Sequence, residues 1–359
     1  MNNDKHSNQQ NKNHKQKQNH DHDEERTERT ERSEHSHHHR RSDLVRISIA
    51  AMTERGLLPE FSSSVEHQLS RIHGAAQDAG DDIRDLTALL WSSIDNDDSM
   101  DLDQLTVIET MPDGKIKLFV AIADVDALFK KGTPIFFFND TATTEIYTSA
   151  RIFPMLPNKL CTDLTSLNPD EDRLAVVTEM VFRADTSLAG ATIYRAKVRN
   201  QAKLAYDAVS AWIDGEGKLP KAAAAVKGME AQLRAQDALA QKLRKRRRTE
   251  GSLEFETLQP RAQFDGEKVV DIQQQVQNRA RQLIEEVMIV TNGCTARYLA
   301  SRGGASLRRV VRSPERWLRI VGVAAEYGHT LPNEPDSKAL ESFLAKRHRE
   351  DPLRFPDLS

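Results

Sequence analysis

Residues 93–105 read Ser-Ile-Asp-Asn-Asp-Asp-Ser-Met-Asp-Leu-Asp-Gln-Leu, with five carboxylates in nine positions. The acidic residues are Asp95, Asp97, Asp98, Asp101 and Asp103. Because no Lys or Arg lies among them, the segment is either a fully solvated acidic loop or a divalent-cation site built from hard oxygen ligands. An EF-hand calcium loop is excluded, since its sixth and twelfth positions would be Met100 and Thr106 instead of Gly and Glu. A Mg²⁺ or Mn²⁺ site therefore remains as the alternative to a surface loop.

The segments around this acidic stretch predict a mixed α+β fold. A short apolar run ends at Trp91, and the stretch from Ile116 to Val125 is dense in strand-forming residues. Residues 174–182 and 191–199 alternate as strands, with a turn expected near Gly190. Helices are expected over three further ranges, which are 202–213, 223–247 and 276–301.

Composition limits the function classes. The chain has 359 residues, a net charge of −3 and a pI near 6.5, so any attraction to nucleic acid must be local. The two cysteines, Cys161 and Cys294, match no metal or redox spacing and suit a reducing compartment. With neither a run of about 18 apolar residues nor an apolar signal-peptide core, the sequence predicts a soluble cytoplasmic protein.

Three regions follow one another along the chain. Residues 1–42 are rich in His, Gln and charged residues and almost free of apolar ones, which predicts a disordered tail. Residues 43–80 show short helical patterns and form a helical lead-in, too short for a β-barrel domain. Residues 81–359 carry the strand and helix signals of the main domain.

Five segments in order resemble the ribonuclease II (RNB) family of exoribonucleases. The acidic stretch 93–104 is similar to the Asp-rich signature of the family, and Val120-Ala-Ile-Ala-Asp-Val125 to its "HIADV" strand. The segment 153–175 is similar to the family's "IPMLP…LCSL.P…DRLA" stretch. Arg246–Gly251 and Leu283–Met288 match later family segments. The resemblance covers about residues 80–312.

The resemblance implies an RNB-type α+β catalytic domain with a mixed or antiparallel β core. It further implies a Mg²⁺-dependent (or Mn²⁺-dependent) 3′→5′ exoribonuclease that degrades single-stranded RNA to nucleoside 5′-monophosphates. Such hydrolysis needs an activated water and neutralised phosphate charge, and carboxylate-held Mg²⁺ provides both. In the family pattern Asp95, Asp101 and Asp103 are the catalytic and metal-binding residues. In an extended segment Asp101 and Asp103 share one side, and Leu102 turns to the other.

The resemblance also implies RNA-binding residues. Tyr147 and Phe255 fall where the family clamps terminal bases between aromatic rings, and Tyr206 and Glu285 fall where it contacts the sugar–phosphate. Without the family pattern, each aromatic residue is equally consistent with a place in the core. The basic run 242–248 suits phosphate contact and equally suits an exposed helix face.

The chain departs from the family pattern at the metal site and at its C-terminal end. A further Asp is usual where this chain has Gln104, whose amide oxygen still ligates Mg²⁺ but brings no charge. The family's arginine motif and C-terminal OB-fold do not appear before Ser359, and no N-terminal cold-shock barrel is evident, so we expect a truncated member. The arginine is expected to stabilise phosphate charge in the transition state.

Residues 136–148 depart from the family pattern in a different way. They begin with three consecutive Phe residues, and Asn139 to Thr148 equals the translation of one reading frame of a common sequencing adapter. We interpret this segment as contaminating sequence that replaced genuine chain.

Two other interpretations stay open. One is a catalytically impaired RNA-binding fragment, which Gln104 and the missing arginine favour. The other is a divalent-metal-binding protein without an RNA role, based on the His-rich tail and the Asp cluster.

Overall fold

The computed structural model describes residues 40–77, 82–129, 132–135, 145–147, 151–253, 260–274, 277–304, 316–352 and 354–355. The chain divides into two compact units. The first comprises residues 1–57, 147–152 and 260–273, and the second comprises the rest. None of the helices in the described ranges is long and apolar enough to cross a membrane.

The first unit contains helix α2 (Arg41–Glu54) and the hairpin of β10 (Pro260–Asp265) and β11 (Lys268–Gln274). Glu267, in the turn of the hairpin, accepts two backbone N–H groups from the first turn of α2. Arg41 N donates to its carbonyl oxygen at 2.8 Å, and Ser42 N donates to its carboxylate at 3.1 Å. These groups have no partner within a helix, so the hairpin satisfies the start of α2.

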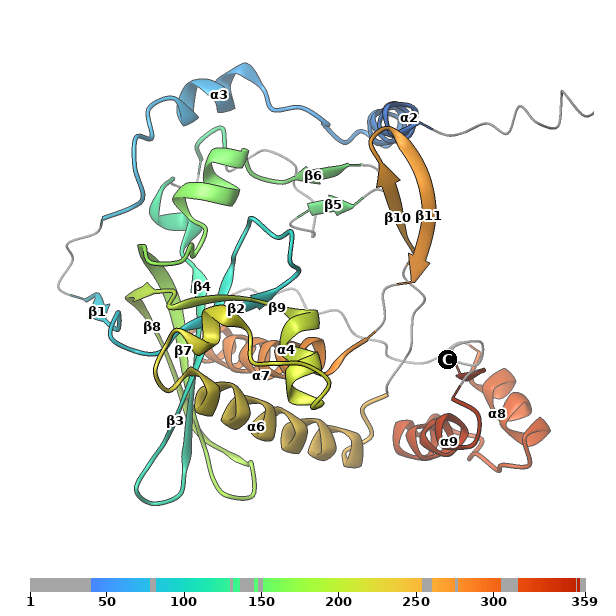
Figure 1. The fold of residues 1–359 in the computed structure, drawn as a ribbon. Coiled ribbons are helices and arrows are strands. Elements are labelled where there is room, and N and C mark those ends of the chain that lie inside the picture. Colours follow the sequence, from blue (N-terminus) through green and yellow to red (C-terminus); the bar gives the residue numbers. More distant parts are fainter. Residues whose placement is uncertain are drawn as a thin grey trace, which may run out of the picture. The chain divides into compact units, whose positions relative to one another are not determined.

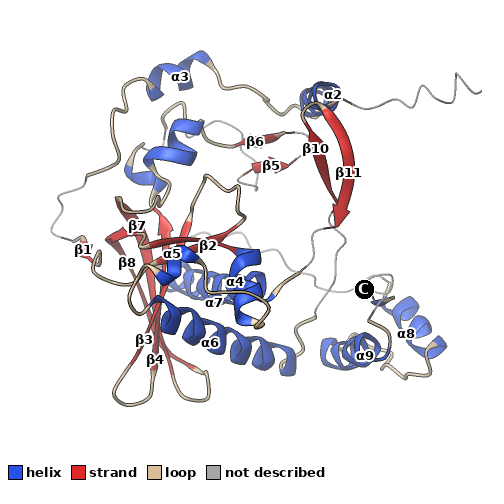
Figure 2. Cartoon of the chain, viewed as in Figure 1, coloured by secondary structure: helices blue, strands red, loops and turns tan. Residues whose placement is uncertain are grey.

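The second unit is built on a seven-stranded sheet of order β1-β8-β7-β4-β3-β2-β9 (Figures 1 and 2). Its strands are β1 (Arg84–Asp85), β2 (Ser92–Asp95), β3 (Gln104–Thr110), β4 (Ile116–Ala123), β7 (Asp172–Phe182), β8 (Leu188–Arg199) and β9 (Ala202–Ala205). All neighbours are antiparallel except β1 with β8 and β2 with β9, which are parallel. Smaller elements of this unit are α3 (Ser63–Leu69), η1 (Val125–Ala127) and η2 (Lys159–Leu164), while β5 (Glu145–Tyr147) and β6 (Ile152–Pro154) each include residues of both units.

Strand β4 is covered on both faces of the sheet, and its sequence is apolar except for Lys117. Leu118 and Val120 belong to one core cluster, whereas the alternate residues Phe119 and Ala121 belong to the other. Successive side chains of a strand point to opposite faces, so a strand covered on both sides has no polar face. Trp91 is fully buried in the cluster of Phe119 and Ala121, which we call the second core cluster, and its ring lies edge-on to Phe119.

Helices cover the face of the sheet that carries Leu118 and Val120. These are α4 (Tyr206–Ile213), α5 (Lys221–Ala224), α6 (Met229–Thr249) and α7 (Arg279–Ser301), and Figure 1 shows α6 and α7 side by side. Strand β2 begins at Ser92, too late to pair with Ile108 of β3. The Gln232 side chain on α6 takes that place, accepting from Ile108 N at 2.8 Å and donating to Ile108 O at 2.6 Å. A half-buried side-chain amide thus satisfies backbone groups that no strand reaches.

Helices α8 (Trp317–Glu326) and α9 (Ser337–Glu350) share a separate small core. Trp317, Leu340 and Phe343 are buried there, and the Trp317 ring N–H donates to the carbonyl oxygen of Pro332 at 2.9 Å. Asp336 caps α9 by accepting from the backbone N–H groups of Lys338 and Ala339.

The predicted α+β class is confirmed, with a mostly antiparallel sheet and surrounding helices. Two local predictions were wrong. Residues 202–205, expected as the start of a helix, form strand β9, because pairing with β2 overrides their local helix preference. Gly190 lies inside β8 opposite Val181, and the chain turns at residues 183–187 instead, with Thr186 at a positive φ of 63°.

Candidate active site

Asp95 and Tyr206 are brought together by the parallel pairing of β2 and β9. Asp95 is the last residue of β2 and pairs in register with Ala205, so Tyr206 follows at the start of α4. The buried Asn200 holds this junction, donating to Ser93 Oγ at 3.0 Å and to the carbonyl oxygen of Leu167 at 2.9 Å. The strand that sequence analysis missed is therefore the element that positions Tyr206.

The loop between Asp95 and Asp103 is anchored through its own backbone. Leu102 is buried in the second core cluster, and its N–H donates to Ser166 Oγ at 2.9 Å while its carbonyl oxygen accepts from Leu167 N at 2.8 Å. The Lys203 ammonium donates to the Ser99 carbonyl oxygen at 2.6 Å. These contacts fix the two residues that flank Leu102, namely Asp101 and Asp103.

The three aspartates interact electrostatically. Burial of the carboxyl, with repulsion from Asp95 and Asp101, raises the pKa of Asp103 to about 6. Asp103 as a whole is exposed to water, and the repulsion acts between its carboxylate and those of Asp95 and Asp101. The pKa of Asp95 is raised too, mainly by burial, although the Asn96 N–H donates to this carboxylate at 2.6 Å and lowers the pKa. The carboxylates therefore form one cluster of negative charge.

Tyr206 and Arg281 adjoin this cluster. Burial and the charge of Asp95 raise the pKa of Tyr206 to about 12, so its hydroxyl stays protonated at neutral pH. The Arg281 guanidinium lies 4.4 Å from the centroid of the Tyr206 ring and donates to Asn96 Oδ1 at 2.7 Å. Sequence analysis missed Arg281. The available signal was its position four residues before Glu285, which puts both residues on one face of α7.

Of the remaining predicted residues, Glu285 is described and the two aromatic side chains are not. Glu285 is on α7, where it accepts from Gln277 at 3.0 Å and lies 3.7 Å from the Arg247 guanidinium. Tyr147 belongs to β5, but its side chain lies outside the described residues, as do Phe255 and residues 136–144 and 148. The aromatic clamp and the adapter-like segment therefore stay predictions.

Gln104 is buried beneath the site. Its Nε2 donates to the carbonyl oxygen of Ile94 at 3.1 Å, while Oε1 is buried without a hydrogen-bond partner. An orphaned amide oxygen and three carboxylates match the donor chemistry of Mg²⁺. Within the described ranges, however, no three His, Cys, Asp or Glu side chains are gathered closely enough to hold an ion. The donor atoms suit Mg²⁺, and a bound ion would have to draw the carboxylates together.

Comparisons with known proteins identify the family. The RNB domain model matches residues 83–357, so the chain belongs to the RNB domain family. Over 269 residues it is 32% identical to Ribonuclease R of Escherichia coli (strain K12), covering 73% of this chain and 32% of that protein. Over 242 residues it is 34% identical to Exoribonuclease 2 of Enterobacter sp. (strain 638), covering 65% of this chain and 36% of that protein. The chain thus spans about a third of the length of these relatives.

The fold agrees with this assignment. The structure of Mycoplasma genitalium RNase R in complex with ribose methylated single-stranded RNA superposes with a TM-score of 0.77 at 24% identity. The match covers 88% of this chain and 49% of that one. At this identity the likeness shows the fold alone.

Proposed function

We propose that the chain carries the catalytic domain of a Mg²⁺-dependent 3′→5′ exoribonuclease, which hydrolyses single-stranded RNA to nucleoside 5′-monophosphates. The observation that carries this proposal is the cluster of Asp95, Asp101 and Asp103, in which burial and like charges raise the pKa of Asp103 to about 6 beside a protonated Tyr206. Clustered carboxylates in an RNB-family fold are the arrangement expected for cation-assisted phosphodiester hydrolysis.

Each side chain has a role in this proposal. Asp95, Asp101 and Asp103 hold the cation, which when bound neutralises phosphate charge and makes water a better nucleophile. The Tyr206 hydroxyl donates a hydrogen bond to an oxygen of the terminal sugar–phosphate, because at neutral pH it keeps its proton. Arg281, fixed on the Tyr206 ring and on Asn96, places a positive charge near the same phosphate.

RNA is the proposed partner, and the proposed location is a reducing cytoplasm. Both cysteines, Cys161 and Cys294, are free thiols, and Cys294 is buried, where it packs as an apolar residue. A compartment that keeps thiols reduced suits this usage.

Oligoadenylate labelled at its 5′ end tests the proposal with the chain as it is. In Mg²⁺ we expect a ladder of labelled products that shorten stepwise, and none in EDTA. The same substrate labelled at its 3′ end should release labelled mononucleotide at once, which fixes the direction of attack. Internal cuts, or a ladder that persists in EDTA, would contradict the proposal.

One observation favours the second candidate, a catalytically impaired RNA-binding fragment. Gln104 stands where the family pattern has a carboxylate, and its amide oxygen brings no charge. Among the described residues, no three His, Cys, Asp or Glu side chains lie close enough together to bind an ion. Binding of the labelled RNA without shortening would support this candidate.

Replacing Gln104 with Asp separates the two candidates. We expect Gln104→Asp to raise Mg²⁺-dependent cleavage by about tenfold, because affinity for a hard cation rises with the number of charged ligands. The variant should melt at a lower temperature in EDTA, since a buried carboxylate then lacks a counter-charge and the carbonyl oxygen of Ile94 loses its donor. Added Mg²⁺ should reverse that loss.

Gln104→Asn is the matched control, since it shortens the side chain equally but stays neutral. It should show neither the gain in cleavage nor the larger stabilisation by Mg²⁺. Equal behaviour of the two variants would mean that position 104 does not face the cation.

A further inference from the structure

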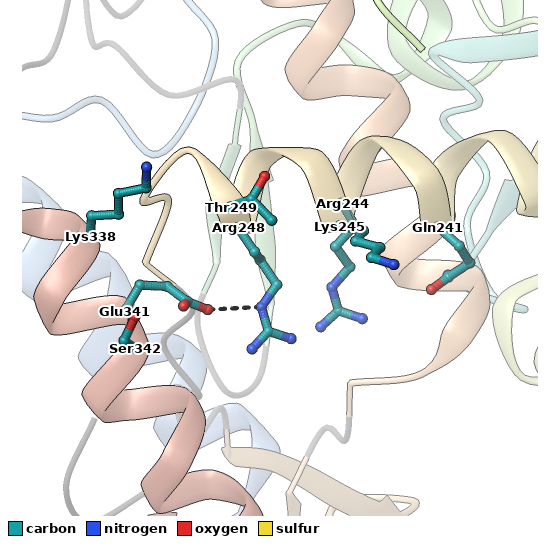
Figure 3. Close-up of a pocket in the computed structure, with 8 residues that line it drawn as sticks. All are labelled: Gln241, Arg244, Lys245, Arg248, Thr249, Lys338, Glu341 and Ser342. Atoms are coloured by element: carbon teal, nitrogen blue, oxygen red, sulfur yellow. Dashed lines mark hydrogen bonds and ion pairs between the residues drawn. The ribbon is translucent and has the colours of Figure 1, made fainter. Parts of the chain in front are cut away.

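A basic pocket lies between α6 and α9, separate from the aspartates. Its volume is about 530 Å³, and the cationic side chains that line it are Arg244, Lys245, Arg248 and Lys338. Figure 3 shows the Arg244 and Arg248 side chains extending below α6, with Glu341 of α9 beside Arg248. The one carboxylate in the lining is Glu341, and the remaining lining residues are Gln241, Thr249 and Ser342.

Three consecutive arginines at the end of α6 each form an ion pair. Arg246 pairs with Glu250 of the same segment at 2.9 Å, and Arg247 pairs with Glu286 of α7 at 2.5 Å. Arg248 reaches α9, where it pairs with Glu341 at 2.9 Å, the ion pair drawn in Figure 3. Arg246 thus pairs within its own helix, whereas Arg247 and Arg248 link α6 to α7 and α9, and Arg248 also lines the pocket.

The pocket keeps an excess of positive charge. Glu341 pairs with Arg248, and the two lysines of the lining, Lys245 and Lys338, are exposed to water at its rim. The whole chain carries a net charge of −3, so this excess is local and has no counterpart in the overall composition. The first backbone N–H groups of α9 are already used by Asp336, so any anion here must be bound by side chains.

We propose that this pocket binds phosphates of the RNA backbone, outside the carboxylate site. Guanidinium and ammonium groups around a polar hollow match phosphodiester oxygens, and contacts of this kind position a strand without reading its sequence. The pocket would hold RNA whether or not the aspartates cleave it, so the proposal does not depend on catalysis.

Binding of a short fluorescein-labelled oligouridylate, measured by anisotropy in EDTA, tests the pocket without cleavage. The test variant is Lys245→Gln/Lys338→Gln, and the control is Lys221→Gln/Lys227→Gln, which removes two exposed lysines elsewhere. At low salt we expect the test variant to lose about tenfold in affinity. Its salt slope should fall by about 1.4, or about 0.7 for each phosphate that is no longer neutralised by a lysine. The control should bind like the parent chain.

Binding of two further ligands, a DNA strand and free adenosine monophosphate, identifies the source of the phosphate. A DNA strand of equal length should lose affinity to the same extent in the test variant, because backbone contacts do not read the 2′-hydroxyl. Equal losses in test and control variants, with unchanged melting temperatures, would overturn the proposal. It would also be overturned if free adenosine monophosphate bound as tightly as the oligonucleotide and depended equally on the two lysines.

Discussion

Replacing Asp103 with Asn is expected to reduce Mg²⁺-dependent cleavage of oligoadenylate by about 10³-fold or more, because several kcal/mol of charge stabilisation depend on the carboxylate cluster. Asp103 interacts with both Asp95 and Asp101, so its loss weakens the whole donor set. The measurement is the initial rate of ladder formation at saturating Mg²⁺. Binding of the same RNA in EDTA should change little, since the substitution removes negative charge only.

The same variant should be more stable than the parent chain when no metal is present. Burial and repulsion raise the pKa of Asp103 to about 6, so the folded state binds a proton more readily than the unfolded chain. Stability from this group is therefore present at low pH and is lost as the pH rises through about 6. At pH 7.5 in EDTA, Asp103→Asn should raise the melting temperature by about 1–3 °C, and this gain should vanish well below pH 5.

Asp97→Asn is the matched control for both measurements, since it makes the same change at an exposed position of the same loop. It should retain cleavage and show no pH-dependent gain in stability. An Asp103→Asn variant that keeps near-parental cleavage would contradict the assignment of Asp103 to the reacting centre.

Most of the fold could be predicted because its strands are covered on both faces. Strand β4 is apolar except for Lys117, and such a pattern admits few structures other than a central strand. Strand β9 could not be predicted, since Ala-Lys-Leu-Ala has the composition of a helix, and only its pairing with β2 makes it a strand. Local preference decides little over four residues when an unpaired strand edge lies alongside.

The site was predictable for its aspartates and less so for their surroundings. Asp95, Asp101 and Asp103 share a compact sequence pattern, whereas Arg281 lies 186 residues beyond Asp95 and meets it only through the packing of α7. The partners of the basic run 242–248 also depend on helix packing and could not be predicted from the sequence. In the sequence, residues 242–248 form a basic run, but in the structure Arg247 pairs with α7 and Arg248 with α9, while Arg246 pairs with Glu250 at the end of its own helix.

Arg247 is the arginine whose loss should cost the most stability. Its guanidinium donates to both carboxylate oxygens of Glu286, and its Nη1 donates to Ser252 Oγ at 2.6 Å. The Glu286 side chain is only 3% exposed, so removing the arginine leaves a buried carboxylate without its counter-charge. We expect Arg247→Met to lower the free energy of unfolding, measured in urea by circular dichroism, by about 3–5 kcal/mol.

Two further variants show that this loss comes from the orphaned charge. Arg246→Met removes the neighbouring arginine, whose pair with Glu250 is 44% and 61% exposed, and should cost at most about 1 kcal/mol. The double variant Arg247→Met/Glu286→Leu removes both charges and should regain most of the loss, because an apolar pair of similar size replaces a buried ion pair at little cost. If the double variant were as unstable as Arg247→Met alone, the arginine would act through its packing between α6 and α7 instead of its charge.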